Sequence, residues 1–410
     1  MRSRGAHVSR ALPGLLLAAG LGTGCSGGAP PAAAVPASWD ETVAAARGQS
    51  VVWTMWQGDP YINAYVRDWV TPRLRDEFGI DLVVVGGQGA QLTSRLMTEI
   101  EAGRTRSATD IVWINGETFY QLRQLGALAG PFVADLPNAA AIDFSNPFIA
   151  RDFQQPVEGF ECPWGNVQLA IIHDTRRVAD PPRTRAALAA WVRAHPGRFT
   201  FDSSFTGMTF LKSLLIDVAG GPGALDGPFD EARYGAAAAA LWDSLRSIRR
   251  YFWKAGRTFP EGVAQLHQLF AAGEVDFTMS NNDGEVDNKV LQGLFPETAR
   301  AYVLDGGTIQ NTHYLGIVSR AEHPEGARVV INFLISPEAQ LHKLEPGVWG
   351  DGTVLDVSRL PETWRARFAA VPGRRFAPPR AEIQPHALQE LAPEYMIRIS
   401  DDFRTEILER

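Results

Sequence analysis

The amino-terminal third of the chain repeats one pattern three times: a short apolar run, then a polar turn, then a segment with helical spacing. The apolar runs lie at 50–56, 80–85 and 110–114 and read SVVWTMW, IDLVVV and DIVWI. Strands that alternate with helices in this way pair in parallel through right-handed crossovers. The pattern therefore predicts a parallel sheet whose strand ends, WQGD, GGQG and NGE, lie at one edge, where such sheets bind ligands.

The length of the chain limits the number of folding units. It has 410 residues, which is more than one ordinary core holds and is comfortable for two lobes of α/β type. Beyond the third repeat we expect a further strand at 168–173 and a long amphipathic helix at 236–252. The expected fold class is therefore α/β with two lobes, each a mostly parallel sheet flanked by helices.

Composition and motifs exclude several classes of function. Hydrophobic residues make up 45% and charged residues 21% of the chain, as in soluble globular proteins. The net charge is −7 without a basic stripe, so no nucleic-acid partner is expected. The sequence has no G-x-S-x-G, H-E-x-x-H or C-x-x-C motif, and the spacing of SNNDGEVD at 280–287 is not that of an EF-hand loop. We therefore expect no catalytic residue, no metal and no cofactor.

The first residues have the order of a secretory signal. Several arginines precede a short apolar run at 11–21, which is too short to span a bilayer, and small residues then lead to Cys25. This segment resembles the lipobox of bacterial lipoproteins, with Gly22 where a Leu is usual. We expect residues 1–25 to be a lipoprotein-type signal with Cys25 lipidated as the mature N-terminus; the alternative is an ordinary cleaved signal. Residues 26–48, rich in Gly, Pro and Ala at their start, are expected to be a flexible tether.

A polar turn and a buried strand are expected to meet at 161–174, where the sequence is ECPWGNVQLAIIHD. The Trp-Gly-Asn stretch that begins at Trp164 is typical of a turn, and the apolar run that follows is typical of a buried strand. We interpret the run as a strand that crosses between two lobes, with Trp164 and Asn166 facing the ligand. Cys162 is interpreted as a small apolar filler.

Three stretches, in the same order along the chain, resemble one protein family. They are GFECPWGNVQLAIIHDTRRV, LFAAGEVDFTMSNND and THYLGIVSRAEHPEGARVVINFLISPEAQ. The sequence resembles the family-1 extracellular solute-binding proteins of bacterial ABC importers, a group that includes thiamine, polyamine and ferric-iron binders. Within that group it is similar to a lipoprotein branch that is often grouped with thiamine uptake.

The resemblance implies a type II-like periplasmic-binding-protein fold, in which crossing strands join two lobes and the ligand lies between them. The implied boundaries are 49–160 plus 306–336 for lobe 1 and 161–305 plus 337–410 for lobe 2. The implied function is a binding protein and not an enzyme: a periplasmic or extracytoplasmic monomer, lipid-anchored to the membrane. It would capture a small-molecule solute, thiamine-like or otherwise cationic or aromatic, and deliver it to ABC permease and ATPase subunits.

Polar and aromatic residues at the expected strand ends and turns are the candidate ligand contacts. An indole face and a carboxylate suit a cationic or ring-bearing solute. The residues expected to bind ligand are Trp56, Gln57, Asp59, Asn115, Gly116, Trp164, Asn166, Ser203, Ser204, Thr206, Asn281, Asn282, Asn311 and Trp349.

Each of these residue types also has a structural interpretation. Trp56 can cap the sheet, Asp59 can cap the following helix, and the Ser and Thr residues at 203–206 are preferred N-caps. His313 is a lone histidine beside an apolar strand and is interpreted as structural. At the level of function, a sugar, polyamine or metal-complex binder is the alternative to a thiamine-like binder, and an extracellular hydrolase or a structural lipoprotein is a rival class.

Overall fold

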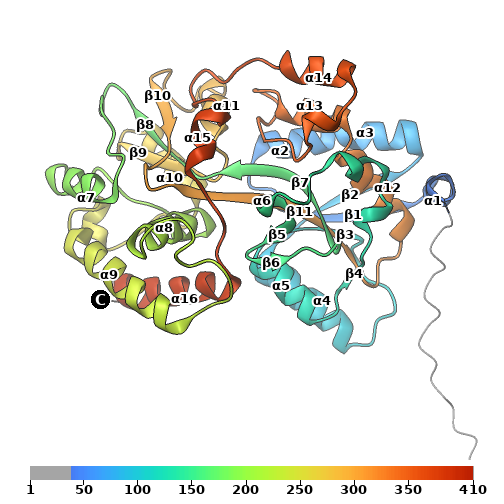
Figure 1. The fold of residues 1–410 in the computed structure, drawn as a ribbon, viewed down its shortest axis with the longest axis horizontal. Coiled ribbons are helices and arrows are strands. Elements are labelled where there is room, and N and C mark those ends of the chain that lie inside the picture. The colour runs from blue at the N-terminus through green and yellow to red at the C-terminus, as the bar shows by residue number, and fades with distance from the viewer. Residues whose placement is uncertain (1–37, 410) are drawn as a thin grey trace, which may run out of the picture. The chain divides into compact units, whose positions relative to one another are not determined.

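The computed structural model describes residues 38–409, so the signal segment, Cys25 and most of the expected tether lie outside the described residues. Within this range two lobes each have their own sheet and hydrophobic core (Figure 1). This confirms the two-lobed α/β fold class. None of the helices within residues 38–409 is both long and apolar enough to cross a membrane.

Lobe 1 is built on a seven-stranded sheet with the central order β12-β11-β3-β1-β2, to which β4 and β7 are added along β11; its β12 end reaches into lobe 2, where Leu388 lies in the core. Strand β1 pairs in parallel with both β2 and β3, as the repeated pattern predicts. The strands are β1 (Ser50–Met55), β2 (Asp81–Gly86), β3 (Ile111–Ile114), β4 (Leu128–Ala129), β7 (Glu161–Gln168), β11 (Thr308–Val318) and β12 (Ala387–Leu388). The hairpin of β5 (Arg151–Asp152) and β6 (Gln155–Pro156) lies beside this sheet.

Helices cover both faces of the lobe 1 sheet, and α4 and α5 enclose a smaller core of their own. They are α1 (Trp39–Ala46), α2 (Pro60–Ala64), α3 (Thr71–Arg73), α4 (Gly89–Glu101), α5 (Glu117–Gln124), α6 (Pro147–Ala150), α12 (Pro324–Leu334), α13 (Pro337–Leu344) and α14 (Glu362–Ala369).

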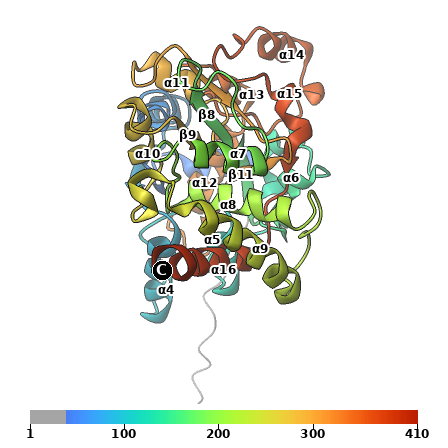
Figure 2. The same ribbon diagram turned by 90° about the vertical axis from the view of Figure 1, so that its left-hand side faces the viewer.

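Lobe 2 holds a three-stranded sheet with the order β10-β8-β9. Both of its pairings are antiparallel, so the expectation of a mostly parallel sheet is wrong for this lobe. Its strands are β8 (Ala170–Asp174), β9 (Phe277–Ser280) and β10 (Ala299–Tyr302). Figure 2 views the lobe from its outer side, with α7, α9 and α16 in front. The helices are α7 (Arg185–Ala194), α8 (Phe205–Val218), α9 (Glu231–Arg249), α10 (Val263–Ala271), α11 (Glu285–Leu291), α15 (Arg380–Ile383) and α16 (Pro393–Phe403).

The chain crosses between the lobes three times. It leaves lobe 1 where β7 ends and β8 begins, and it returns along β11, whose Ile309 lies in the core of lobe 2 and whose Leu315 lies in the core of lobe 1. Strands β7 and β11 pair antiparallel, so these two crossings form one ribbon. The third crossing connects Phe368 in the lobe 1 core with Phe376 in the lobe 2 core.

The structure corrects three expected boundaries. Residues 161–168 form β7 in the lobe 1 sheet, and residues 337–371, which include the buried Leu341 and Leu355, pack on lobe 1 rather than lobe 2. Part of the expected tether is the helix α1, which is capped by Ser38 and buries Ala46 completely. The sequence does not indicate which lobe these segments pack on, because the spacing of apolar residues identifies the buried face of a helix but not the core that it covers.

The Trp-Gly-Asn stretch is not a turn but part of β7, and every residue of this strand is buried. Gly165 occupies a strand position because a side chain would not fit there: a Cβ atom would lie 2.1 Å from Oδ2 of Asp351. Glycine inside a strand often marks such a close approach rather than a reversal of the chain. Cys162 is a buried free cysteine, as expected, and burial raises the pKa of its thiol.

Candidate functional site

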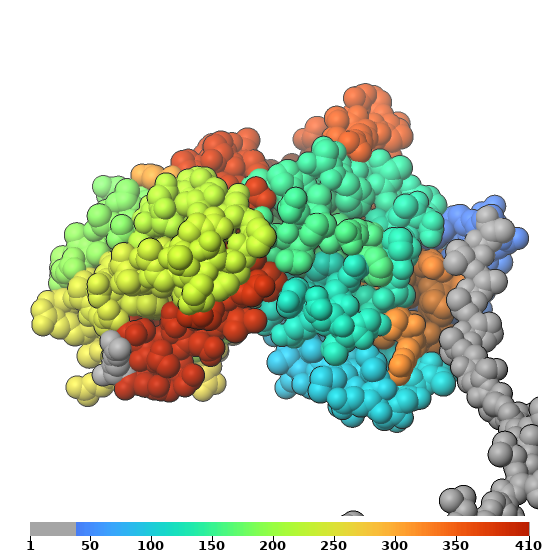
Figure 3. Space-filling view, turned by 60° about the horizontal axis from the view of Figure 1, so that its bottom comes forward, coloured from blue at the N-terminus to red at the C-terminus, as the bar shows by residue number. Residues whose placement is uncertain are grey.

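The space-filling view shows a groove between the two lobes (Figure 3). Residues of the lobe 2 helices and of the carboxyl-terminal segment form one side, and residues of the first 160 positions form the other. The carboxyl ends of β1 and β3 carry the first and third of the predicted polar turns. The candidate site therefore consists of these turns, the β7–β11 ribbon and the turns of lobe 2.

The turn after β1 supplies a ring and a charge. Trp56 is half-buried and its indole covers Gly58, where a Cβ atom would lie 2.3 Å from the ring. Gln57 is exposed. Asp59 caps α2 by accepting hydrogen bonds from the backbone N–H of Tyr61 at 2.8 Å and of Ile62 at 3.2 Å. The structural interpretation of Asp59 as a helix cap is thus confirmed, and the second oxygen of this carboxylate lies 2.9 Å from Nζ of Lys289 on α11.

Trp56 is the outermost ring of an aromatic cluster that extends into the lobe 1 core. Its ring meets the edge of Trp113 at a centroid distance of 6.4 Å. Trp113 in turn contacts Trp164 at 5.0 Å and His313 at 5.2 Å. Such edge-to-face pairs each contribute about 0.5–1.5 kcal/mol beyond the area they bury. The cluster therefore packs against Trp56 from the lobe 1 core, and the indole itself stays half-buried.

Trp164 and Trp349 lie deeper in the same cluster. Their exposed fractions are 0% and 3%, and their ring centroids are 5.1 Å apart. The expectation that Trp164 is exposed beside the ligand is wrong, because β7 runs through the middle of lobe 1. Trp349 likewise belongs to the hydrophobic core of that lobe.

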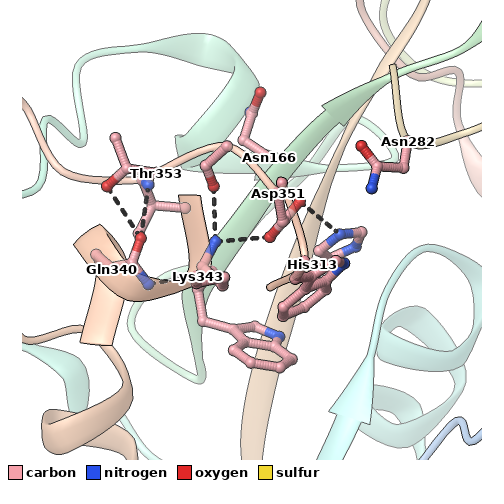
Figure 4. Close-up of polar contacts among 12 residues, drawn as sticks. Asn166, Asn282, His313, Gln340, Lys343, Asp351 and Thr353 are labelled. Carbon is pink, nitrogen blue, oxygen red and sulfur yellow. Dashed lines mark hydrogen bonds and ion pairs between the residues drawn. The ribbon is translucent and has the colours of Figure 1, made fainter. Parts of the chain in front are cut away.

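A buried ionic network contacts the aromatic cluster through His313 (Figure 4). Lys343 Nζ lies 2.6 Å from Oδ2 of Asp351 and donates to the carbonyl of Gly352 at 2.7 Å. His313 Nε2 lies 3.4 Å from the other oxygen of Asp351. Burial alone would raise the pKa of Asp351, but the neighbouring Lys343 and His313 lower it. The carboxylate is therefore charged, and it orients the His313 ring.

Gln340 connects this network to β7. It is fully buried and donates to the carbonyl of Trp164 at 2.8 Å, while its own oxygen accepts from Thr353 at 3.0 Å. In Figure 4 Asn282, from lobe 2, lies across from Asp351 with its side chain directed toward His313.

The turn after β3 is tied to the ribbon. Asn115 donates from Nδ2 to Oδ1 of Asn311 at 3.0 Å, and Asn311 donates to Glu390 at 3.3 Å. Glu390 is paired with the fully buried Lys212 at 2.6 Å. Asn311 also lines a small hollow between the β5–β6 hairpin and residues 389–390. The N–H of Gly116 donates to Asp152, so it is not free to bind a ligand.

The lobe 2 wall consists of two turns that contact each other. Asn281 donates from Nδ2 to Oγ1 of Thr206 at 3.2 Å, while its Oδ1 is buried without a hydrogen-bond partner. Ser204 at the start of α8 bonds Asp202, and Ser203 is exposed. Asn282 accepts from the N–H of Gly284 at 3.0 Å, which leaves its Nδ2 available. These amides and hydroxyls are suited to hydrogen-bonding a polar solute.

The ribbon is joined to lobe 2 by a charged cluster. Asp283 has no exposed side-chain surface, pairs with Arg374 and with Arg380 at 2.9 Å, and accepts from the N–H of Gln168 at 2.9 Å. Burial alone would raise the pKa of Asp283, but the two guanidinium groups lower it to about 2. Arg380 also donates to the carbonyl of Asn166, whose Nδ2 donates to Thr312 at 3.0 Å.

The predicted site residues thus fall into three groups. Half-buried or exposed positions are Trp56, Gln57, Asp59, Asn115, Ser203, Ser204, Asn281 and Asn282, whereas Thr206, the hydrogen-bond partner of Asn281, is buried. Buried positions of the ribbon and its flanking turns are Gly116, Asn166 and Asn311, and core positions are Trp164 and Trp349. Sequence reasoning did not identify Trp113, Asp351 and Lys343 as part of this cluster, and the structural interpretation of His313 agrees with its packing against Trp113 and Trp349. The alternation of side chains along β3 gave a signal for Trp113, but nothing local connects residues 343 and 351 to the ribbon.

The described residues contain no group of three or more His, Cys, Asp or Glu side chains placed to hold a metal ion. Lys212, Lys343, Arg374 and Arg380 each pair with a carboxylate, so their charges are compensated within the protein. What remains at the walls is aromatic surface, hydroxyls and amides.

The model of the bacterial extracellular solute-binding proteins matches residues 72–370. The chain belongs to this family. It is 35% identical to Protein YnjB of Escherichia coli (strain K12) over 353 residues, which cover 85% of this chain and 90% of YnjB. The family is one of extracellular solute-binding proteins, so the chain is a solute-binding protein of this bacterial type.

Solved structures share the fold at low sequence identity. The TpPotD lipoprotein of Treponema pallidum has a TM-score of 0.64 at 13% identity, covering 88% of this chain and 100% of that chain. AfuA from Actinobacillus pleuropneumoniae, solved with fructose-6-phosphate bound, has a TM-score of 0.62 at 12% identity, covering 88% and 98%. A putative spermidine/putrescine ABC transporter protein from Listeria monocytogenes has a TM-score of 0.60 at 17% identity, covering 88% and 99%.

Proposed function

We propose that the chain binds a small organic solute with a flat or cationic group, such as a thiamine-like compound, in the groove between its lobes. The observation that carries this proposal is the half-buried indole of Trp56, whose ring packs edge-to-face with Trp113 of the aromatic cluster. A supported indole stacks on a flat ring or attracts a cation without losing much side-chain freedom. The amides of Asn115, Asn281 and Asn282 supply hydrogen bonds that fix the orientation of the solute.

The charges of the site favour this class of ligand over an anion. Lys343, Arg380 and Lys212 are engaged by Asp351, Asp283 and Glu390, so an anionic solute would have to displace a buried partner to reach these three cations. Removing one partner of a buried pair costs several kcal/mol. A polyamine or a neutral sugar satisfies the same hydrogen-bonding groups, and the experiment below distinguishes them from a ring-bearing solute.

The test is to identify what the protein carries. The chain is purified from its native cells, denatured, and the released small molecules are identified by mass spectrometry. We expect one organic, ring-bearing or cationic compound in wild type and its loss in Trp56→Ala. Trp364→Ala is the matched control, because Trp364 is also half-buried in lobe 1 but lies on α14. A released anion, or equal retention by both variants, would contradict the proposal.

We also propose that Cys25 anchors the protein to the membrane through lipid. The arginine-rich start, the apolar run at 11–21 and the small residues before Cys25 support this proposal. Several acyl chains give firm anchoring, at about 0.8 kcal/mol per buried CH₂. Cys25→Ser should move the protein from the membrane fraction to the soluble fraction. Wild-type protein without added lipid mass would contradict the proposal.

A further inference from the structure

Helix α11 of lobe 2 makes a set of contacts with lobe 1 that do not involve a solute. Lys289 Nζ lies 2.9 Å from Oδ2 of Asp59, the carboxylate that caps α2. The two side chains are only 7% and 13% exposed, so this pair is largely removed from water. Pairs with this burial are screened far less by solvent than surface pairs are.

The residue before Lys289 adds two hydrogen bonds across the same boundary. Asn288 donates from Nδ2 to the carbonyl of Trp349 at 2.6 Å, and its Oδ1 accepts from the N–H of Gly347 at 3.1 Å. The hydroxyl of Tyr61 donates to the carbonyl of Asn288 at 3.4 Å. Trp349 lies in the lobe 1 core, whereas Val286 on the same helix as Asn288 lies in the lobe 2 core. The amide of Asn288 therefore bridges two rigid bodies.

Lys289 also has an ion-pair partner within its own lobe. Glu285, one helical turn earlier, lies 3.1 Å from Lys289 Nζ, and its carboxylate is also near His267. Burial alone would lower the pKa of Lys289, but Glu285 and Asp59 raise it, so the ammonium keeps its charge. When the lobes separate, Lys289 loses Asp59 and keeps Glu285, so opening breaks the contact without leaving a buried charge unpaired. A contact of this kind can form and break repeatedly.

We propose that Asp59, Asn288 and Lys289 form an interlobe latch that holds the lobes together in the absence of solute. The latch goes beyond the proposed function, because it does not depend on which solute binds. Its consequence is that the unliganded protein is mostly closed and opens transiently to admit solute. Since the latch favours the closed form whether or not the groove is occupied, the solute contributes only the remaining part of the closing free energy.

The latch is tested by measuring the distance between the lobes in protein freed of solute by unfolding and refolding. Spin labels are placed at Met97→Cys on α4 and Ile397→Cys on α16, two exposed apolar positions on different lobes, in a Cys25→Ser background. The buried Cys162 remains unlabelled. Double electron–electron resonance then gives the populations of short and long distances.

We expect wild type to show mainly the short distance, and Lys289→Met to lower the ratio of closed to open protein by roughly tenfold, as loss of a charged hydrogen bond predicts. Asp59→Asn is the second variant: asparagine is as good an N-cap as aspartate, so α2 is preserved while the charge is lost. If Lys289→Met does not fold, Asp59→Asn decides the test. Arg359→Met is the control, because the Arg359–Asp143 pair lies within lobe 1.

The proposal is overturned if solute-free wild type shows mainly the long distance. It is also overturned if the folded latch variants have the same distance distribution as Arg359→Met. An open-shifted distribution in both latch variants, with the control unchanged, supports it.

Discussion

Replacing Trp164 by alanine tests where the structure places the boundary between core and site. The side chain has 0% exposure and contacts Trp53, Trp113 and Trp349 at centroid distances of 5.4, 5.0 and 5.1 Å. A buried Trp of this kind removes roughly 150–250 Å² from water, which at about 25 cal/mol per Å² amounts to ~4–6 kcal/mol. Because the unfolded chain already buries part of this surface, we expect a loss of about 3–5 kcal/mol in the free energy of unfolding.

The assay for Trp164→Ala is urea unfolding followed by circular dichroism, together with the affinity of the refolded variant for the solute released from wild type. If Trp164 is a core residue, stability falls by several kcal/mol while the affinity of the remaining folded protein changes little. A stability loss below about 1 kcal/mol combined with a large loss of affinity would refute the placement of Trp164 in the core.

Two further predictions concern the ribbon between the lobes. Gly165→Ala should destabilise the protein by more than about 2 kcal/mol in urea unfolding, because the new Cβ would collide with Asp351. Gly235→Ala is the control: Gly235 lies on α9 with open space around it, so this variant should be about 0.4–1 kcal/mol more stable than wild type. Equal effects of the two variants would argue against the close approach of Asp351 to Gly165. The pKa of Asp283 is lowered from 3.8 to about 2 in the folded protein, so its contribution of ~2 kcal/mol should be present above pH 4 and be lost as the pH falls toward 2. Asp283→Asn should flatten the pH dependence of the unfolding free energy in this window, and parallel curves for wild type and variant would contradict the assignment.

The repeated pattern of apolar run and polar turn was sufficient to predict the parallel pairing of β1, β2 and β3, because this pairing depends on local periodicity. It was not sufficient for lobe 2, where β8 pairs antiparallel with β9, a strand that lies about 100 residues later in the sequence. The lobe assignment of residues 337–371 failed for the same reason: their apolar faces fit either core, and only the packed structure selects lobe 1.

The candidate site was predictable to the extent that strand ends determine it. Trp56, Asp59 and Asn115 follow strands and lie where the pattern places them. Trp164 was misplaced because a Trp-Gly-Asn sequence has the composition of a turn, although the glycine is required by the close approach of Asp351. The pairing of Lys343 with Asp351 next to His313 depends on how α13 and the loop after it pack against β11, and local spacing gives no signal for this packing.

The central claim, that the solute is held between the lobes by both walls, is tested most directly by hydrogen–deuterium exchange. The purified chain is compared with and without the solute recovered from it, and exchange is followed in peptides from each lobe. The account predicts slower exchange on both sides of the groove, around Trp56 and Asn115 in lobe 1 and around Ser204 and Asn281 in lobe 2. Protection confined to one lobe, or located away from these turns, would contradict it.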